Sequence, residues 1–119
     1  MKVFCHHIYE YKKGLRNLIL HTMSARDVKM AIRKLEANQI HYLIQPVTSA
    51  KVNVFFGADE CVEVIKCFCH KRLNELSPEE DFILGALLGY NQVVQCGRYL
   101  KKKKEAPLLK EAPLLKEAS

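Results

Sequence analysis

The residues best suited to chemistry in this chain are cysteines and histidines in the segment ECVEVIKCFCHKRL, which begins at Glu60. In a helix, Glu63, Cys67 and His70 recur at i, i+4 and i+7 and share one face. A neighbouring imidazolium lowers the pKa of a cysteine, and the same three groups are part of a zinc ligand set. The spacing permits a reactive thiol or a metal face. A solvated polar face gives the same pattern, so we expect no metal site here.

A second group, Cys5-His6-His7, lies near the N-terminus. Adjacent side chains point in different directions on a helix or a strand, so this triplet cannot hold one ion unless a second copy completes the site. The sequence also contains no P-loop, no G-x-G-x-x-G, no nucleophile elbow and no C-x-x-C motif. We therefore expect no catalytic residue, no cofactor and no enzymatic activity.

Composition indicates one globular domain of 119 residues, with 49% hydrophobic and 27% charged residues. No apolar run approaches the ~20 residues that cross a bilayer, and no signal peptide is recognisable. The five cysteines fit reduced thiols. We expect a cytoplasmic protein without membrane contact.

The formal charge of +6 is unevenly distributed, since residues 1–100 hold 13 Lys and Arg against 10 Asp and Glu. Lys101–Lys104 supply much of the rest. Beyond them the chain repeats KEAPLL, with prolines that disfavour a long helix. We predict a domain over residues 1–100 and a flexible basic tail over residues 101–119.

Hydrophobic periodicity predicts alternating helices and strands. Residues 3–12 fit either a helical stripe or strand alternation, and Gly14 favours the helix because glycine caps helix ends. The further predicted elements are a strand over residues 15–22, a helix over 24–39, a hairpin of strands 40–46 and 51–57, and a helix over 59–75. This pattern indicates an α+β fold with a small three-stranded sheet packed by about five helices.

The stretch LSPEEDFILGALLGYN, residues 76–91, predicts a helix that begins with a capping box between Ser77 and Glu80. A last helix follows Asn91. The helix from Pro78 has almost no polar face beyond its first turn, so it must be covered on all sides. One expectation is a homodimer interface at Phe82, Gly85, Ala86 and Gly89, with the glycines allowing a second backbone to come close. The alternative is a central core helix in which Gly89 is only a C-terminal cap.

Three segments carry a resemblance: HHIYEYKKGLRNLILHT, VNVFFGADECVEVIK and SPEEDFILGALLGYNQVVQCGRYL. Over residues 3–100 the chain resembles a family of small uncharacterised bacterial proteins classed only as a domain of unknown function. The resemblance implies three strands, about five helices and a homodimer. It also implies a link to flavodoxin, beside which members tend to be encoded, but it assigns no functional residue.

Basic side chains suggest two kinds of partner. Arg26, Lys29 and Arg33 share a face of the helix over residues 24–39, and positive surface steers association with an acidic protein such as flavodoxin. The alternative is nucleic acid. Against it, the chain lacks Trp, and strand alternation buries at least one ring of Phe55-Phe56. A solvated helix face also explains the three cations.

Overall fold

Three antiparallel strands form the centre of the fold: β1 (Leu18–Ser24), β2 (His41–Pro46) and β3 (Lys51–Gly57). In the computed structural model, which describes residues 1–110, β3 lies between β1 and β2 and pairs with both. Strands β2 and β3 form a hairpin, closed where the Val47 N–H donates to the Lys51 carbonyl at 3.0 Å. The predicted hairpin is confirmed, and β1 begins three residues later than expected.

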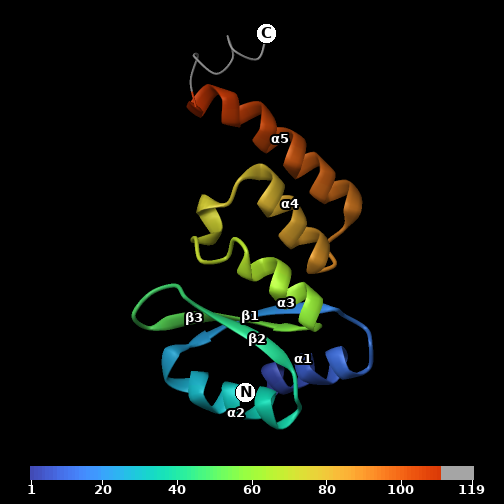
Figure 1. Cartoon of the computed structure of the whole chain (residues 1–119), viewed down its shortest axis with the longest axis vertical. Helices are drawn as coiled ribbons and strands as arrows, with labels where there is room; N and C mark the ends of the chain where they lie inside the picture. The colour runs from blue at the N-terminus through green and yellow to red at the C-terminus, as the bar shows by residue number, and fades with distance from the viewer. Residues whose placement is uncertain (111–119) are drawn as a thin grey trace.

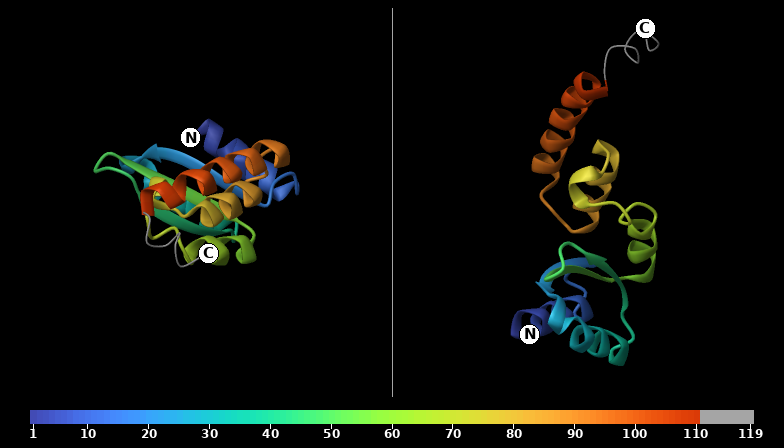
Figure 2. Two further views of the ribbon diagram at one scale, coloured as in Figure 1. Left: turned by 90° about the horizontal axis from the view of Figure 1, so that it is seen from above. Right: turned by 90° about the vertical axis from the view of Figure 1, so that its left-hand side faces the viewer.

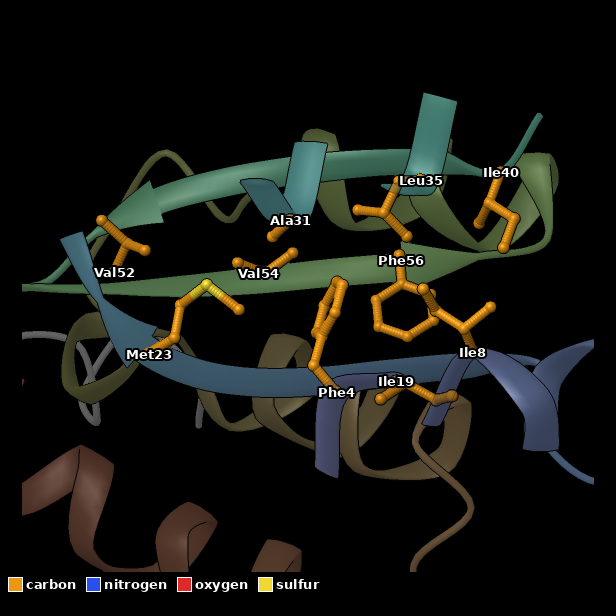
Figure 3. Close-up of a cluster of buried hydrophobic side chains, with 10 residues drawn as sticks. All are labelled: Phe4, Ile8, Ile19, Met23, Ala31, Leu35, Ile40, Val52, Val54 and Phe56. Carbon is orange, nitrogen blue, oxygen red and sulfur yellow. The ribbon is translucent and has the colours of Figure 1, made fainter. Parts of the chain in front are cut away.

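One face of the sheet is covered by α1 (Lys2–Lys12), the 3₁₀ turn η1 (Ala25–Asp27) and α2 (Val28–Ala37). Apolar side chains of both helices meet those of the three strands in a continuous core (Figures 1 and 3). Phe4 and Phe56 pack edge to face with ring centroids 5.4 Å apart. The core residues are Phe4, Ile8, Ile19, Met23, Ala31, Leu35, Ile40, Val52, Val54 and Phe56.

The segment that fitted both a helix and a strand is helical. In α1, Phe4 and Ile8 are one turn apart and both are buried against the sheet. Gly14 follows the helix with a φ of +79°, a conformation that glycine adopts without strain. Burial of this helical stripe decides between the two periodicities.

The other face of the sheet carries α3 (Asp59–Lys66), the 3₁₀ turn η2 (Leu73–Glu75) and α4 (Pro78–Leu87). Strand β3 supplies both cores, because Val54 and Phe56 face α1 and α2 whereas Phe55 faces α3. The second core consists of Leu18, Phe55, Val62, Ile65, Phe68, Cys69, Leu84 and Leu88. Within residues 1–110 the structure has three strands and five α-helices, which confirms the α+β fold.

The helix predicted over residues 59–75 is too long. Helix α3 ends at Lys66, and the chain tightens into turns in which Cys67 N donates to Val64 O and Phe68 N to Ile65 O, both at 3.1 Å. Beyond the helix end, Nε2 of the buried Gln45 side chain donates hydrogen bonds to Cys69 O at 2.9 Å and to Lys71 O at 2.8 Å. A contact with β2 thus replaces the helical hydrogen bonds that the local sequence would allow.

Helix α5 (Gln92–Lys110) packs on α4 and extends away from the sheet, giving a molecule of 53 × 31 × 20 Å (Figures 1 and 2). Residues 101–110, predicted to belong to a flexible tail, continue helix α5 in the structure. Four lysines in succession are good helix formers, and Lys103 Nζ anchors this part of α5 to Glu79 of α4 at 2.9 Å. The prediction for residues 111–119 lies outside the described residues. Within residues 1–110, no helix has the length and apolar character needed to span a membrane.

Candidate interaction surfaces

Helices α4 and α5 form an antiparallel hairpin that is joined by a close fit between two residues. Gly85 of α4 is buried, and the side chain of Gln95 of α5, itself only 5% exposed, occupies the space where any larger residue would place its Cβ. The capping box predicted for α4 is confirmed, since Glu80 N donates to Ser77 Oγ at 3.1 Å and Ser77 N donates to Glu80 Oε1 at 2.9 Å. Helix α4 therefore has a fixed start and a fixed contact with α5.

Polar pairs at the rim set the angle and register of the hairpin. Arg98 donates to both carboxylate oxygens of Asp81, at 2.7 Å from Nε and 3.0 Å from Nη2. The Tyr99 hydroxyl donates to Glu79 Oε2 at 3.0 Å. Hydrogen bonds from Lys103 and Tyr99 hold the pKa of Glu79 below its usual value, with that from Lys103 the larger cause. These bonds join the first turn of α4 to the part of α5 that contains Arg98, Tyr99 and Lys103.

One side of this hairpin is an apolar groove of about 500 Å³, lined by Phe82, Ile83, Cys96, Tyr99 and Leu100 with Glu79 at its rim. We call it the hairpin groove. Phe82 and Tyr99 pack edge to face across it, with ring centroids 5.4 Å apart. Leu100 remains 64% exposed and Ile83 39% exposed. The described chain leaves this surface uncovered.

The apolar surface continues along α5. Val93, Cys96 and Leu100 recur at i, i+3 and i+7, so they form one stripe, and all three are exposed. Gly97 lies beside the stripe, and among the described residues no atom outside its chain neighbours and its own helix backbone would lie within 4 Å of a Cβ at this position. Alanine would fit there and would favour the helix by up to ~1 kcal/mol, so packing within the described chain gives no reason for the glycine.

The four residues predicted at a dimer interface fall in different environments. Phe82 and Ala86, one turn apart, share the groove side of α4, and Ala86 is exposed. Gly85 instead faces Gln95 of the same chain. Gly89 follows α4 with a φ of +81° and acts as its C-terminal cap, as the alternative interpretation held.

The three predicted basic residues lie at the other end of the molecule. Arg26 belongs to η1, and Lys29 and Arg33 are one turn apart on α2; all three are exposed. Within residues 1–110, no carboxylate pairs with any of them. They form a solvent-facing basic surface on the layer farthest from α5 (Figure 1).

The residues with the most suggestive chemistry are not assembled into a site. Because α3 ends at Lys66, Glu63 lies in the helix whereas Cys67 and His70 lie in the following turn. The Cys67 thiol donates to Glu63 O at 3.5 Å, and Glu63 Oε2 pairs with Lys66 at 3.2 Å. In the part of the chain that the structure describes, no three His, Cys, Asp or Glu residues are arranged to hold a metal ion.

The N-terminal histidines interact with a carboxylate and with another histidine. His7 Nδ1 lies 3.2 Å from Glu10 Oε1, and the hydrogen bond from His7 is the largest cause that lowers the pKa of Glu10. The rings of His7 and His21 are 5.4 Å apart. Burial lowers the pKa of His21, and the charge of His7 contributes further. Cys5 is exposed and shares none of these contacts.

Sequence reasoning missed a polar network that crosses the sheet. Thr22 Oγ1 donates to Asn53 Oδ1 at 2.6 Å, and Asn53 Nδ2 donates to Gln45 Oε1 at 2.9 Å. Gln45 then holds the turn after α3, next to a pocket lined by Lys66, His70, Lys71 and Arg72. The only sequence signal was the polar residue at positions 45 and 53 inside otherwise apolar strands.

A comparison with known families matches residues 2–102 to the family DUF2023, described as a protein of unknown function. No curated protein shows a significant match to the chain.

Proposed function

The chain belongs to the DUF2023 family of proteins of unknown function, and we propose that it is a non-enzymatic, homodimeric interaction module. In this proposal two copies join through their hairpin grooves, and each copy offers its basic α2 surface to an acidic protein. The observation that carries the proposal is the uncovered apolar groove between α4 and α5, lined by Phe82, Ile83, Cys96, Tyr99 and Leu100.

A second copy is the occupant that fits the groove best. Two helical hairpins related by a two-fold axis make a four-helix bundle, which buries the apolar sides of all four helices together. The exposed stripe of Val93, Cys96 and Leu100 supplies the side chains that such a bundle needs. Gly97 gives the second helix room to approach. Glu79 and Lys103 form a polar pair at the rim, as is usual around an apolar interface.

The dimer would leave the basic surface free. Helices α1 and α2 cover the face of the sheet that points away from the hairpin (Figures 1 and 2). Arg26, Lys29 and Arg33 would therefore face solvent in both copies. Because exposed cations speed association with a negative surface, the partner we propose is an acidic protein. Flavodoxin is the first candidate, on the strength of the family resemblance.

The dimer is tested by sedimentation equilibrium of the full chain and of Leu100→Glu, from about 1 to 100 μM. We expect twice the chain mass for the unaltered protein and a monomer for the variant, because a carboxylate in an apolar interface is costly to desolvate. Val94→Glu is the matched control, since Val94 is 66% exposed but lies outside the hairpin groove. A monomeric mass for the unaltered protein at about 100 μM contradicts the dimer.

The partner is tested separately by titrating labelled flavodoxin, and in parallel a labelled DNA duplex, at low and high salt. We expect binding of flavodoxin that weakens with salt and is reduced about tenfold by Lys29→Glu, while Leu100→Glu retains the basic surface. Nucleic-acid binding is the alternative outcome. One observation argues against nucleic-acid binding. The rings of Phe55 and Phe56 are both fully buried, so they cannot stack on bases.

A further inference from the structure

Strand β2 lies at the edge of the sheet and has one free side. Val47 N bonds to Lys51 O, and hydrogen-bonded pairs alternate along an antiparallel ladder, so Leu43 and Gln45 bond to β3. The backbone N–H and C=O groups of Tyr42 and Ile44 therefore point outward. Within residues 1–110, no other backbone group is bonded to them. Two donors and two acceptors are thus presented in a row.

This edge lacks most of the features that protect sheet edges from pairing with another chain. Such edges are usually blocked by charged side chains, bulges or proline. From Tyr42 to Gln45 the strand carries no charged residue, and its pairing with β3 is regular. Only Pro46 restricts this edge. Because it has no N–H to donate, another chain can pair with β2 only along the segment before Pro46.

A basic pocket of about 310 Å³ lies directly beside the edge. Leu43–Pro46 form one side of it, and Lys66 and Cys69–Arg72 form the other. Its lining contains four basic side chains and no carboxylate. Lys66 and Lys71 have carboxylate partners outside the lining, Glu63 at 3.2 Å and Glu80 at 2.7 Å, whereas no ion pair involves His70 or Arg72 in the described chain.

The pocket wall is held in place by buried hydrogen bonds. Gln45, only 8% exposed, donates to Cys69 O and Lys71 O, the carbonyls on either side of His70. Asn53 of β3 donates in turn to Gln45 Oε1. The edge strand and the basic turn are therefore fixed relative to each other before any ligand arrives, which lowers the entropy cost of binding.

The geometry points to a binding site for an acidic peptide in extended conformation, which adds as an antiparallel strand to the edge of β2. Main-chain bonds to Tyr42 and Ile44 supply affinity, and alternate side chains supply specificity. Residues opposite Tyr42 and Ile44 place their side chains on the α2 side of the sheet, with those two residues. The residues between them face the α3 side, where acidic side chains meet Lys66, His70 and Arg72. This site depends neither on the dimer nor on the basic α2 surface.

A second copy of the chain is a poor occupant of this edge. Pairing of two β2 strands around a two-fold axis perpendicular to the sheet would bring both copies of α3 and its basic turn to the same face. The two sets of Lys66, Lys71 and Arg72 would then be neighbours, and like charges repel. An acidic partner removes this repulsion and gains the opposite interaction.

The test uses the full chain and the labelled, end-blocked peptide Glu-Val-Glu-Val-Glu-Val. We expect saturable binding by fluorescence anisotropy, with the amide resonances of Tyr42 and Ile44 among the most shifted. Arg72→Glu should weaken binding at least about tenfold. Lys2→Glu on α1 is the matched control, because it makes the same charge change at an exposed residue on the opposite layer and outside the basic α2 surface, and it should change affinity by less than about twofold. The lysine counterpart of the peptide should not bind.

Peptides methylated on the backbone nitrogen identify the main-chain bonds without altering the protein. In antiparallel addition the valine N–H groups face β2, so N-methylation of the valines should abolish binding and N-methylation of the glutamates should not. If binding is lost only with the peptides N-methylated at the glutamates, the peptide adds in parallel at the same edge, and this result would also support the site. Equal tolerance of both series, equal effects of Arg72→Glu and Lys2→Glu, or no binding at all would overturn it.

Discussion

The sheet region and the α4–α5 hairpin differ in how far they bury their apolar side chains. Around the sheet, Phe4, Phe55 and Phe56 are fully buried, each against side chains of other elements. On the hairpin, Leu100 is 64% and Val93 is 80% exposed. The same chain thus completes one core and leaves another apolar surface open. The difference suggests that the stability of the sheet region depends on its own packing, whereas the hairpin has a surface suited to a partner.

The largest effect should come from Phe56→Ala, which removes a fully buried ring that packs against Phe4. We expect a loss of about 3–5 kcal/mol in the free energy of unfolding, because the change combines lost burial with a cavity. Urea unfolding measures it. Val93→Ala on α5 is the comparison, and for a monomer it should change stability by less than about 0.5 kcal/mol. Equal losses in the two variants would mean that the two regions do not differ as described.

A smaller effect is expected from Gly85→Ala, because the new Cβ would overlap the side chain of Gln95. Overpacking of this kind costs about 1–3 kcal/mol. Hydrogen exchange of α5 amides measures whether the loss is confined to the hairpin. Combining it with Gln95→Ala should recover much of the stability, since the smaller side chain leaves room for the methyl group. Strictly additive losses would show that the two residues are not coupled.

The smallest expected effect is a loss of stability at acidic pH. Hydrogen bonds, first from Lys103 to Glu79 and from Lys71 to Glu80, lower the pKa of both carboxyl groups in the folded protein. A lowered folded-state pKa adds stability above the unfolded value of ~4.3, and that contribution is lost as the pH falls through the folded pKa. The contribution of these two carboxyl groups to the urea midpoint should therefore be constant above about pH 5 and decline below about pH 4. Glu79→Gln should reduce the decline, and an unchanged pH profile would contradict this assignment.

Local patterns predicted much of the fold. The β2–β3 hairpin, the capping box at Ser77 and the apolar stripe of α1 all depend on neighbours within one or two turns, and all three are present. The end of α3 could not be predicted in this way. It depends on Gln45, more than 20 residues earlier in the chain, which bonds to Cys69 O and Lys71 O. Long-range contacts of this kind leave no periodicity in the sequence.

The candidate surfaces were predictable in part for the same reason. The apolar character of α4 and the spacing of Arg26, Lys29 and Arg33 are local, so the sequence indicated both surfaces. The fit of Gly85 to Gln95 requires knowledge of how α5 folds back on α4. The pocket beside β2 likewise joins an edge strand to a turn that follows α3. Neither could be derived before the topology was known.

The most direct test of the central proposal is the rate at which each cysteine is alkylated as the protein concentration rises, read by mass spectrometry of peptides. Cys96 lines the hairpin groove, Cys67 is exposed elsewhere, and Cys69 is buried with a pKa raised to about 11, chiefly by its burial. If a second copy covers the groove, alkylation of Cys96 slows with increasing concentration, Cys67 keeps its rate and Cys69 stays slow throughout. Alkylation of Cys96 at the same rate as Cys67 at every concentration up to about 100 μM would contradict a dimer through this groove.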